Sequence, residues 1–168
     1  TNEAKPLYPT SVYAINKRDH EELFLTMGVA YNLPAVALRY FNVYGPRQAL
    51  SNPYTGVAAI FSSRLLNGKA PLIYEDGRQL RDFTHVSDIV QANLLAMDEP
   101  AADYQALNVG CGRALSIGDM AEALGAYLAK DGTQFEITGQ FSAGDIRHCY
   151  GDVSCLRAFG YQAKVRCE

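Results

Sequence analysis

The sequence predicts an α/β protein built around a parallel sheet, and its first fifty residues carry the main observations. Pro9 and Ser11 mark a helix start, and apolar residues then recur at helical spacing between residues 23 and 31. Pro34 ends this helix, and residues 35–41 form a largely apolar run of strand length without clean alternation. Such runs are typical of strands that are covered on both faces of a parallel sheet. A helix, a short loop and a buried strand make half of a βαβ unit.

The rest of the chain alternates short apolar strands with amphipathic helices. The expected strands cover residues 72–74, 83–86, 107–110 and 135–138. The expected helices are residues 57–66, a helix capped by Ser87 or Asp88 that carries Ile89, Val90, Leu94 and Met97, and a helix that opens at Ser116 in a pattern close to a capping box, with Ile117, Met120, Ala121, Leu124 and Leu128 inward. Residues 42–47 are expected to form a loop at the carboxyl end of strand 35–41, where open α/β sheets bind ligands.

Composition narrows the class of protein. The 168 residues suffice for a real core, and their net charge of −3 comes without a basic stripe, so nucleic acid is not an expected partner. No run of eighteen apolar residues occurs, so we expect a soluble, cytoplasmic protein without a membrane partner. The four cysteines include no Cys-x-x-Cys pair, and no metal site is expected.

Tyr13 and Lys17 are the first candidate catalytic residues. They lie four positions apart on the expected first helix, so they share one helix face. A fixed ammonium beside a phenol favours the phenolate, which makes Tyr13 a usable proton acceptor or donor. Oxidation of an alcohol by hydride loss requires such a group for the hydroxyl proton. The pair alone is weak evidence, because a half-buried tyrosine near a solvated lysine is the commoner origin of this spacing.

Five segments in order strengthen this interpretation. They are SVYAINK (11–17), LRYFNVYGPRQ (38–48), YEDGRQLRDFTHVSD (74–88), LNVG (107–110) and GDIRH (144–148). In order and spacing the chain resembles the extended short-chain dehydrogenase/reductase family, and within it the nucleotide-sugar epimerases and dehydratases. The resemblance covers nearly the whole chain and is nearest to the 4-epimerases.

The resemblance implies a fold made of the carboxyl-terminal part of a Rossmann-type parallel sheet plus a small α/β substrate-binding domain. Residues 1–50 would be the residual part of the NAD-binding Rossmann domain. Residues 51–168 would be mainly the nucleotide-sugar domain, with residues 83–110 partly returning to the Rossmann sheet. The family's Gly-x-x-Gly-x-x-Gly turn for the NAD pyrophosphate does not occur in this sequence. The chain therefore looks like the carboxyl half of such an enzyme, inactive in isolation, and the full-length protein is expected to form a homodimer.

The resemblance also implies NAD as the cofactor and a UDP- or dTDP-linked nucleotide-sugar as the substrate. Tyr13 would take the proton of the sugar C4 hydroxyl during hydride transfer, and Lys17 would assist it and hold the nicotinamide ribose. The residues expected along the cofactor are Tyr13, Lys17, Tyr40, Phe41 and Val43. The residues expected along the nucleotide-sugar are Asn42, Val57, Ala58, Tyr74, Arg81, Asn108 and Arg147.

Some alternatives remain open at this point. Relatives usually carry a second diphosphate-binding Arg where this chain has Ser142, and Arg147 is the expected substitute. Asn108 could be structural or a substrate contact, and His85 is given no catalytic part. A 4,6-dehydratase fits the same motifs as a 4-epimerase. A non-catalytic nucleotide-sugar-binding module is the alternative outside the enzymes, although a pure binder has no need for a paired phenol and ammonium.

Overall fold

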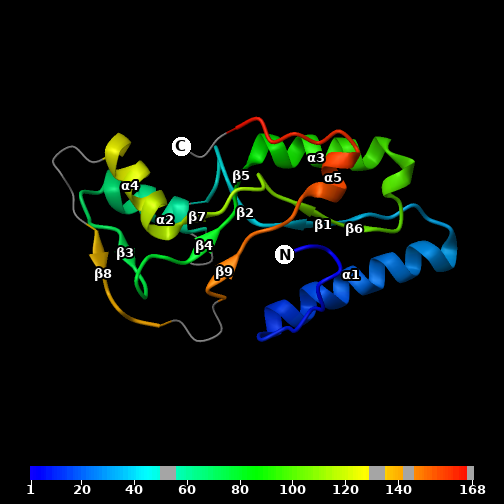
Figure 1. The fold of residues 1–168 in the computed structure, drawn as a ribbon, viewed down its shortest axis with the longest axis horizontal. Coiled ribbons are helices and arrows are strands. Elements are labelled where there is room, and N and C mark those ends of the chain that lie inside the picture. The colour runs from blue at the N-terminus through cyan, green and yellow to red at the C-terminus, as the bar shows by residue number, and fades with distance from the viewer. Residues whose placement is uncertain (50–55, 129–134, 142–145, 166–168) are drawn as a thin grey trace.

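The central layer of the molecule is a parallel pair of strands between helices (Figure 1). The computed structural model describes residues 1–49, 56–128, 135–141 and 146–165. Strand β1 (Ala37–Tyr40) pairs in parallel with β6 (Ala106–Val109), in the register Ala37↔Ala106. Helix α1 (Val12–Tyr31) lies on one side of this pair, and α3 (Val86–Asp98) with α5 (Ser154–Ala158) lies on the other. The expected parallel α/β arrangement is confirmed.

A second parallel pair continues from the first. Strand β2 (Asn42–Tyr44) pairs with β5 (Phe83–His85), so the expectation of a loop from residue 42 onward was wrong for its first three residues. Residues 42–44 form a strand because β5, about forty residues further along the chain, pairs with them. β5 runs directly into α3, whose N-cap is His85 rather than Ser87 or Asp88. The His85 Nδ1 accepts a hydrogen bond from the Ser87 backbone N–H at 3.2 Å, which satisfies the first turn.

A smaller α/β unit packs around a separate core. It contains α2 (Val57–Leu66), α4 (Ile117–Leu128), and the parallel strands β3 (Leu72–Ile73) and β8 (Glu136–Ile137). Its buried centre is made by Phe61, Ile73 and Ala121. The expected capping box is confirmed, because the Ser116 Oγ accepts from the Asp119 N–H at 3.0 Å and the Asp119 carboxylate accepts from the Ser116 N–H at 3.2 Å.

A short three-stranded sheet lies between the two units (Figure 1). Strand β4 (Leu80–Arg81) is its centre, antiparallel to β7 (Leu115–Ser116) and parallel to β9 (His148–Cys149). A single 3₁₀ turn, Pro100–Ala102, links α3 to β6. The sheet places segments that lie far apart in the sequence, near residues 80, 115 and 148, beside one another.

The main core lies between α3, α5 and the β1–β6 pair. It includes Ile89, Ala92, Leu107, Val109, Leu156 and Tyr161. Helix α3 meets the strands through Ile89 and Ala92, while Val90, Leu94 and Met97 of the same helix are exposed. Only Gly28 of α1 is buried, and most of its large apolar residues, including Leu23 and Phe24, are exposed. No helix in the described part of the chain is long and apolar enough to cross a membrane.

Candidate active site

Tyr13 and Lys17 form a contact at the amino end of α1. The Ser11 hydroxyl caps the helix by accepting the Ala14 N–H at 3.1 Å, which fixes the first turn that carries Tyr13. The Lys17 Nζ lies 5.6 Å from the centroid of the Tyr13 ring, within the range of a cation–π contact. The Tyr13 side chain is 71% exposed. The expectation that the phenol and the ammonium share one helix face is confirmed, and the phenol is accessible to a substrate.

The direction of α1 sets where this pair lies relative to the sheet. Helix α1 runs antiparallel to β1, so its amino end lies toward the end of β1 that leads into β2 (Figure 1). In parallel α/β sheets, that carboxyl end is the side on which ligands bind. The Tyr13–Lys17 pair therefore lies on the side of the sheet where chemistry is expected.

The three expected cofactor residues from the end of β1 onward have different surroundings. The Tyr40 hydroxyl donates to the Asn93 Oδ1 at 3.0 Å, which ties it to α3. The Phe41 ring packs directly on Gly151, where a Cβ would collide with the ring. Val43 packs against the main core. The Tyr40 hydroxyl and the Val43 side chain thus have contacts within the chain, and Phe41 requires glycine at position 151.

Arg81 is a buried cation of the central short sheet. Its side chain comes from β4 and only 8% of the residue is exposed. Its Nη1 donates to the Leu80 and Arg147 carbonyl oxygens, both at 2.9 Å. These two hydrogen bonds fix one nitrogen of the planar guanidinium, which gives the group a defined orientation. Arg81 is therefore a fixed positive group suited to a phosphate.

The residue after Arg81 connects it to Asn42. The Asn42 N–H donates to the Asp82 carbonyl oxygen at 2.9 Å, so Asn42 and Arg81 lie near the same junction of strands. The Asp82 carboxylate is fully buried and accepts from the Cys111 N–H at 2.8 Å and the Gly112 N–H at 2.9 Å. Asp82 thereby fixes the chain after β6 against the strand that carries Arg81.

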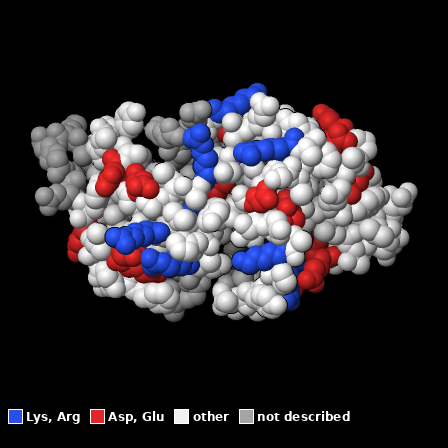
Figure 2. All heavy atoms as spheres, in the orientation of Figure 1, with Lys and Arg blue, Asp and Glu red and all other residues white. Residues whose placement is uncertain are grey.

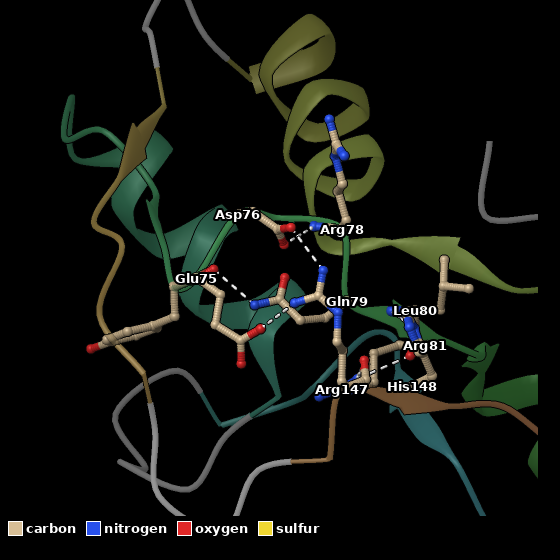
Figure 3. Close-up of polar contacts among 9 residues, drawn as sticks. Glu75, Asp76, Arg78, Gln79, Leu80, Arg81, Arg147 and His148 are labelled. Carbon is tan, nitrogen blue, oxygen red and sulfur yellow. Dashed lines mark hydrogen bonds and ion pairs between the residues drawn. The ribbon is translucent and has the colours of Figure 1, made fainter.

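Arg147 lies between two carboxylates (Figure 3). Its Nη1 is 2.6 Å from the Glu75 Oε2, and its Nη2 is 2.7 Å from the Asp76 Oδ2. These hydrogen bonds lower the pKa of the Asp76 carboxyl and raise the pKa of the Arg147 guanidinium. Sequence reasoning missed Glu75 and Asp76, because no local pattern pairs them with a residue more than seventy positions away. Ser142, Gly144 and Asp145 lie outside the described residues.

The remaining expected substrate residues fall into two groups. Asn108 is buried, and its amide donates to the Thr1 carbonyl at 3.1 Å and the Asp152 carbonyl at 3.0 Å, which are structural contacts. Tyr74 is exposed next to the Glu75–Asp76 turn. Val57 and Ala58 open α2 as expected, and no side chain caps that helix end. The structure thus places Arg147 in contact with both Arg81 and the turn that follows Tyr74, and places Asn108 in the packing of the amino-terminal segment.

Charge on the molecular surface is mixed. Figure 2 shows Lys and Arg interspersed with Asp and Glu over the face in view. Within the described ranges, no group of three or more His, Cys, Asp or Glu side chains is placed to hold a metal ion. His85 makes an edge-on ring contact with Tyr44, with centroids 5.3 Å apart, which together with its capping bond gives it a structural role.

The lowered pKa of Asp76 leads to a first prediction. The ordinary value is 3.8, and because the folded value lies below it, the ionised Asp76 stabilises the fold above about pH 4. This contribution should be lost as the pH falls through the lowered pKa. In a carbon-detected NMR titration, Arg147→Gln should move the Asp76 pKa back up toward its ordinary value. An unchanged titration would show that the ion pair does not form in solution.

Comparisons with known proteins identify the class. The profile of the NAD dependent epimerase/dehydratase family matches residues 1–110. The dTDP-L-rhamnose 4-epimerase of Burkholderia thailandensis is 36% identical over 146 residues, which cover 87% of this chain and 40% of that protein. A putative UDP-glucose 4-epimerase of Methanocaldococcus jannaschii is 29% identical over 98% of this chain and 52% of its own length. The chain spans about half the length of the curated relatives it matches.

Solved structures agree in fold. UDP-glucose 4-epimerase of Thermotoga maritima with UDP-glucose matches with a TM-score of 0.91 and 34% identity, over 99% of this chain and 52% of that one. The Thermus thermophilus UDP-glucose 4-epimerase complex with NAD matches with a TM-score of 0.86 and 31% identity, over 99% and 53%. The parallel strands, the Tyr13–Lys17 pair and these matches lead to one conclusion: the chain belongs to the NAD dependent epimerase/dehydratase family.

Proposed function

We propose that this chain is the part of an NAD-dependent nucleotide-sugar 4-epimerase that supplies the proton-transfer pair and binds the nucleotide-sugar. The observation that carries the proposal is the Lys17 ammonium over the ring of an exposed Tyr13, at the carboxyl side of the parallel strands. An accessible phenol beside a cation can exchange a proton with a sugar hydroxyl.

The proposed reaction begins at the sugar C4 hydroxyl. Tyr13 accepts the hydroxyl proton. During the transfer, the Lys17 ammonium stabilises the negative charge shared by the phenol oxygen and the sugar oxygen. NAD, when bound, supplies the acceptor and later the donor of the C4 hydride. After the 4-keto sugar has turned over in the site, Tyr13 returns the proton to the oxygen and the configuration at C4 is inverted. The exposed phenol and ammonium suit one side of a cofactor site. The segment from the end of β1 into β2, which carries Tyr40, Phe41 and Val43, would line the same site.

The nucleotide-sugar side of the proposal centres on Arg81. Its guanidinium donates to two carbonyl oxygens, and an arginine fork is the side chain best suited to bind diphosphate oxygens. Val57 and Ala58 lie in the first turn of α2, and the N–H groups at the amino end of a helix favour a negatively charged ligand. Tyr74 is exposed nearby and offers a ring for stacking on the base, and Asn42 lies at the same strand junction.

A diphosphate site at Arg81 gives the second prediction. Arg81→Gln should weaken binding of UDP to the chain by at least about tenfold, because a charge-assisted hydrogen bond contributes about 1.5–3 kcal/mol. Isothermal titration calorimetry measures this, with uridine as the ligand control. Arg78→Gln is the matched variant, since it removes one exposed cation from the same segment. Equal UDP affinity of the parent chain and Arg81→Gln would contradict the assignment of Arg81.

Activity is tested in a chimaera. The chain alone should not epimerise, because its sequence contains no Gly-x-x-Gly-x-x-Gly turn for the cofactor pyrophosphate. Replacing the matching half of the Thermotoga maritima enzyme with this chain should yield interconversion of UDP-galactose and UDP-glucose. The chimaera should be assayed with dTDP-sugars as well, because base and sugar are open. A correctly folded chimaera that binds NAD and UDP but turns over none of these sugars would contradict the proposal.

The alternatives predict other outcomes. A 4,6-dehydratase would release a 4-keto-6-deoxy sugar, which mass spectrometry detects. A binding module would bind UDP and support no turnover in the chimaera. We also propose a homodimer of the full-length protein through α1, because the apolar side chains of this helix, including Leu23 and Phe24, are exposed here. The cytoplasmic location stays a prediction.

A further inference from the structure

We propose that Arg147 is a positioning residue for Arg81, which it orients by clamping the Glu75–Asp76 turn, rather than a ligand of the diphosphate. The inference rests on the proposed function for the role of Arg81. It concerns a residue whose side chain and main chain make two separate contacts, one to the turn and one to the phosphate-binding arginine.

Both terminal nitrogens of the Arg147 side chain already bond to carboxylates of the protein. One terminal nitrogen bonds to Glu75 at 2.6 Å and the other to Asp76 at 2.7 Å, so the fork bridges two neighbouring carboxylates (Figure 3). The Glu75 side chain is only 14% exposed, so its carboxylate needs a partner within the protein. To contact a diphosphate in place of these carboxylates, Arg147 would have to leave both and expose them beside a ligand of the same charge.

The clamped turn has an unusual backbone. Glu75 has a φ of 53°, in the left-handed region that residues with a Cβ rarely adopt. Within the turn, the Glu75 N–H donates to the Gln140 carbonyl at 2.9 Å, and the Arg78 N–H donates to the Asp76 carboxylate at 3.0 Å. The Arg147 ion pairs therefore add to contacts that hold a strained conformation, and their loss should loosen it.

The main chain of Arg147 reaches Arg81. Its carbonyl oxygen accepts from the Arg81 Nη1 at 2.9 Å. Directly after it, His148 and Cys149 pair in register with Leu80 and Arg81. The guanidinium of Arg81 is planar, so a hydrogen bond at its Nη1 constrains the orientation of the whole group. A shift of Arg147 would thus move the Arg81 guanidinium as well as the turn.

Charge supports the same division of roles. Glu75 and Asp76 place two negative groups beside Arg147, the residue whose carbonyl oxygen bonds Arg81, and they would oppose the binding of a diphosphate there. The Arg147 guanidinium offsets part of the negative charge of these two carboxylates by direct contact. Arg78 leaves from the same turn in another direction and makes neither ion pair (Figure 3). It is therefore the matched control for losing one positive charge in this segment.

The test is a double-mutant cycle on UDP affinity in the 168-residue chain. Arg147→Gln should weaken UDP binding about fivefold to tenfold, yet cause no further loss in an Arg81→Gln background, because residues acting through one another are not additive. The pair Glu75→Gln/Asp76→Asn should weaken binding as well, since it releases Arg147 from its anchors. Arg147→Lys should recover little, because an ammonium cannot bridge both carboxylates as the fork does, and Arg78→Gln should be near the parent.

A direct phosphate ligand would behave differently. Arg147→Gln would then cost the same factor with or without Arg81, and removing the two carboxylates would leave binding unchanged or tighten it; either result overturns the proposal. Amide hydrogen exchange separates this from failure of the proposed function. If the parent chain does not bind UDP, but residues 75–78 exchange faster in Arg147→Gln than in the parent, the clamp is upheld and the diphosphate site is contradicted. Unchanged exchange there would overturn the clamp itself.

Discussion

Tyr13→Phe in the chimaera should lower kcat for UDP-galactose by about 10²–10⁴-fold, because it removes only the hydroxyl that exchanges the proton. The ring and its contact with the Lys17 ammonium, at 5.6 Å, remain, so binding and folding should be close to the parent. The loss should therefore appear in kcat with little change in the affinity for UDP.

The specificity of this effect is checked with two further variants. Tyr127→Phe removes the hydroxyl of another exposed tyrosine, on α4, and should leave kcat near the parent. Lys17→Met keeps a long side chain but removes the cation 5.6 Å from the Tyr13 ring, so it should also lower kcat. If Tyr13→Phe retained full activity, Tyr13 would not be the proton-transfer group.

Asp82→Ala should have the largest effect on stability, a loss of about 3 kcal/mol or more in the free energy of unfolding. The Asp82 carboxylate is fully buried and accepts the Thr84 hydroxyl at 3.1 Å together with the N–H groups of Cys111 and Gly112. Alanine leaves these donors without their acceptor in the interior. Because Asp82 follows Arg81, the variant should also weaken UDP binding.

Urea denaturation followed by circular dichroism measures this loss. Asp98→Ala is the control, since it removes an exposed carboxylate at the end of α3 and should change the stability by less than about 0.5 kcal/mol. Asp82→Asn keeps one oxygen acceptor and should lie between the two. A loss for Asp82→Ala as small as that of Asp98→Ala would mean that the buried network does not stabilise the junction between the strands.

Local patterns in the sequence predicted much of the fold. Helix α2 has the expected bounds, Val57–Leu66, because Gly56 and the Asn67–Gly68 pair delimit a mainly apolar segment. The capping box at Ser116 was likewise visible in four consecutive residues. These features need no information from distant parts of the chain.

Features that depend on distant partners were not predictable in this way. Strand β2 was expected to be a loop because its pairing with β5 cannot be seen in its own residues. Asp88 was a candidate cap for α3, but its carboxylate accepts the N–H groups of Lys164 and Val165 near the other end of the chain. The ion pairs of Arg147 are the same kind of case, and they changed its expected role.

The most direct test of the account is an NMR titration of the chain with ¹³C-labelled tyrosine and arginine side chains. We expect UDP and UDP-glucose to shift the Arg81 guanidinium signal equally, and only UDP-glucose to shift the Tyr13 ring signal, because the sugar alone reaches the phenol. A shift at Arg81 with no response of Tyr13 to UDP-glucose would contradict the claim that one bound nucleotide-sugar connects the two halves of this site.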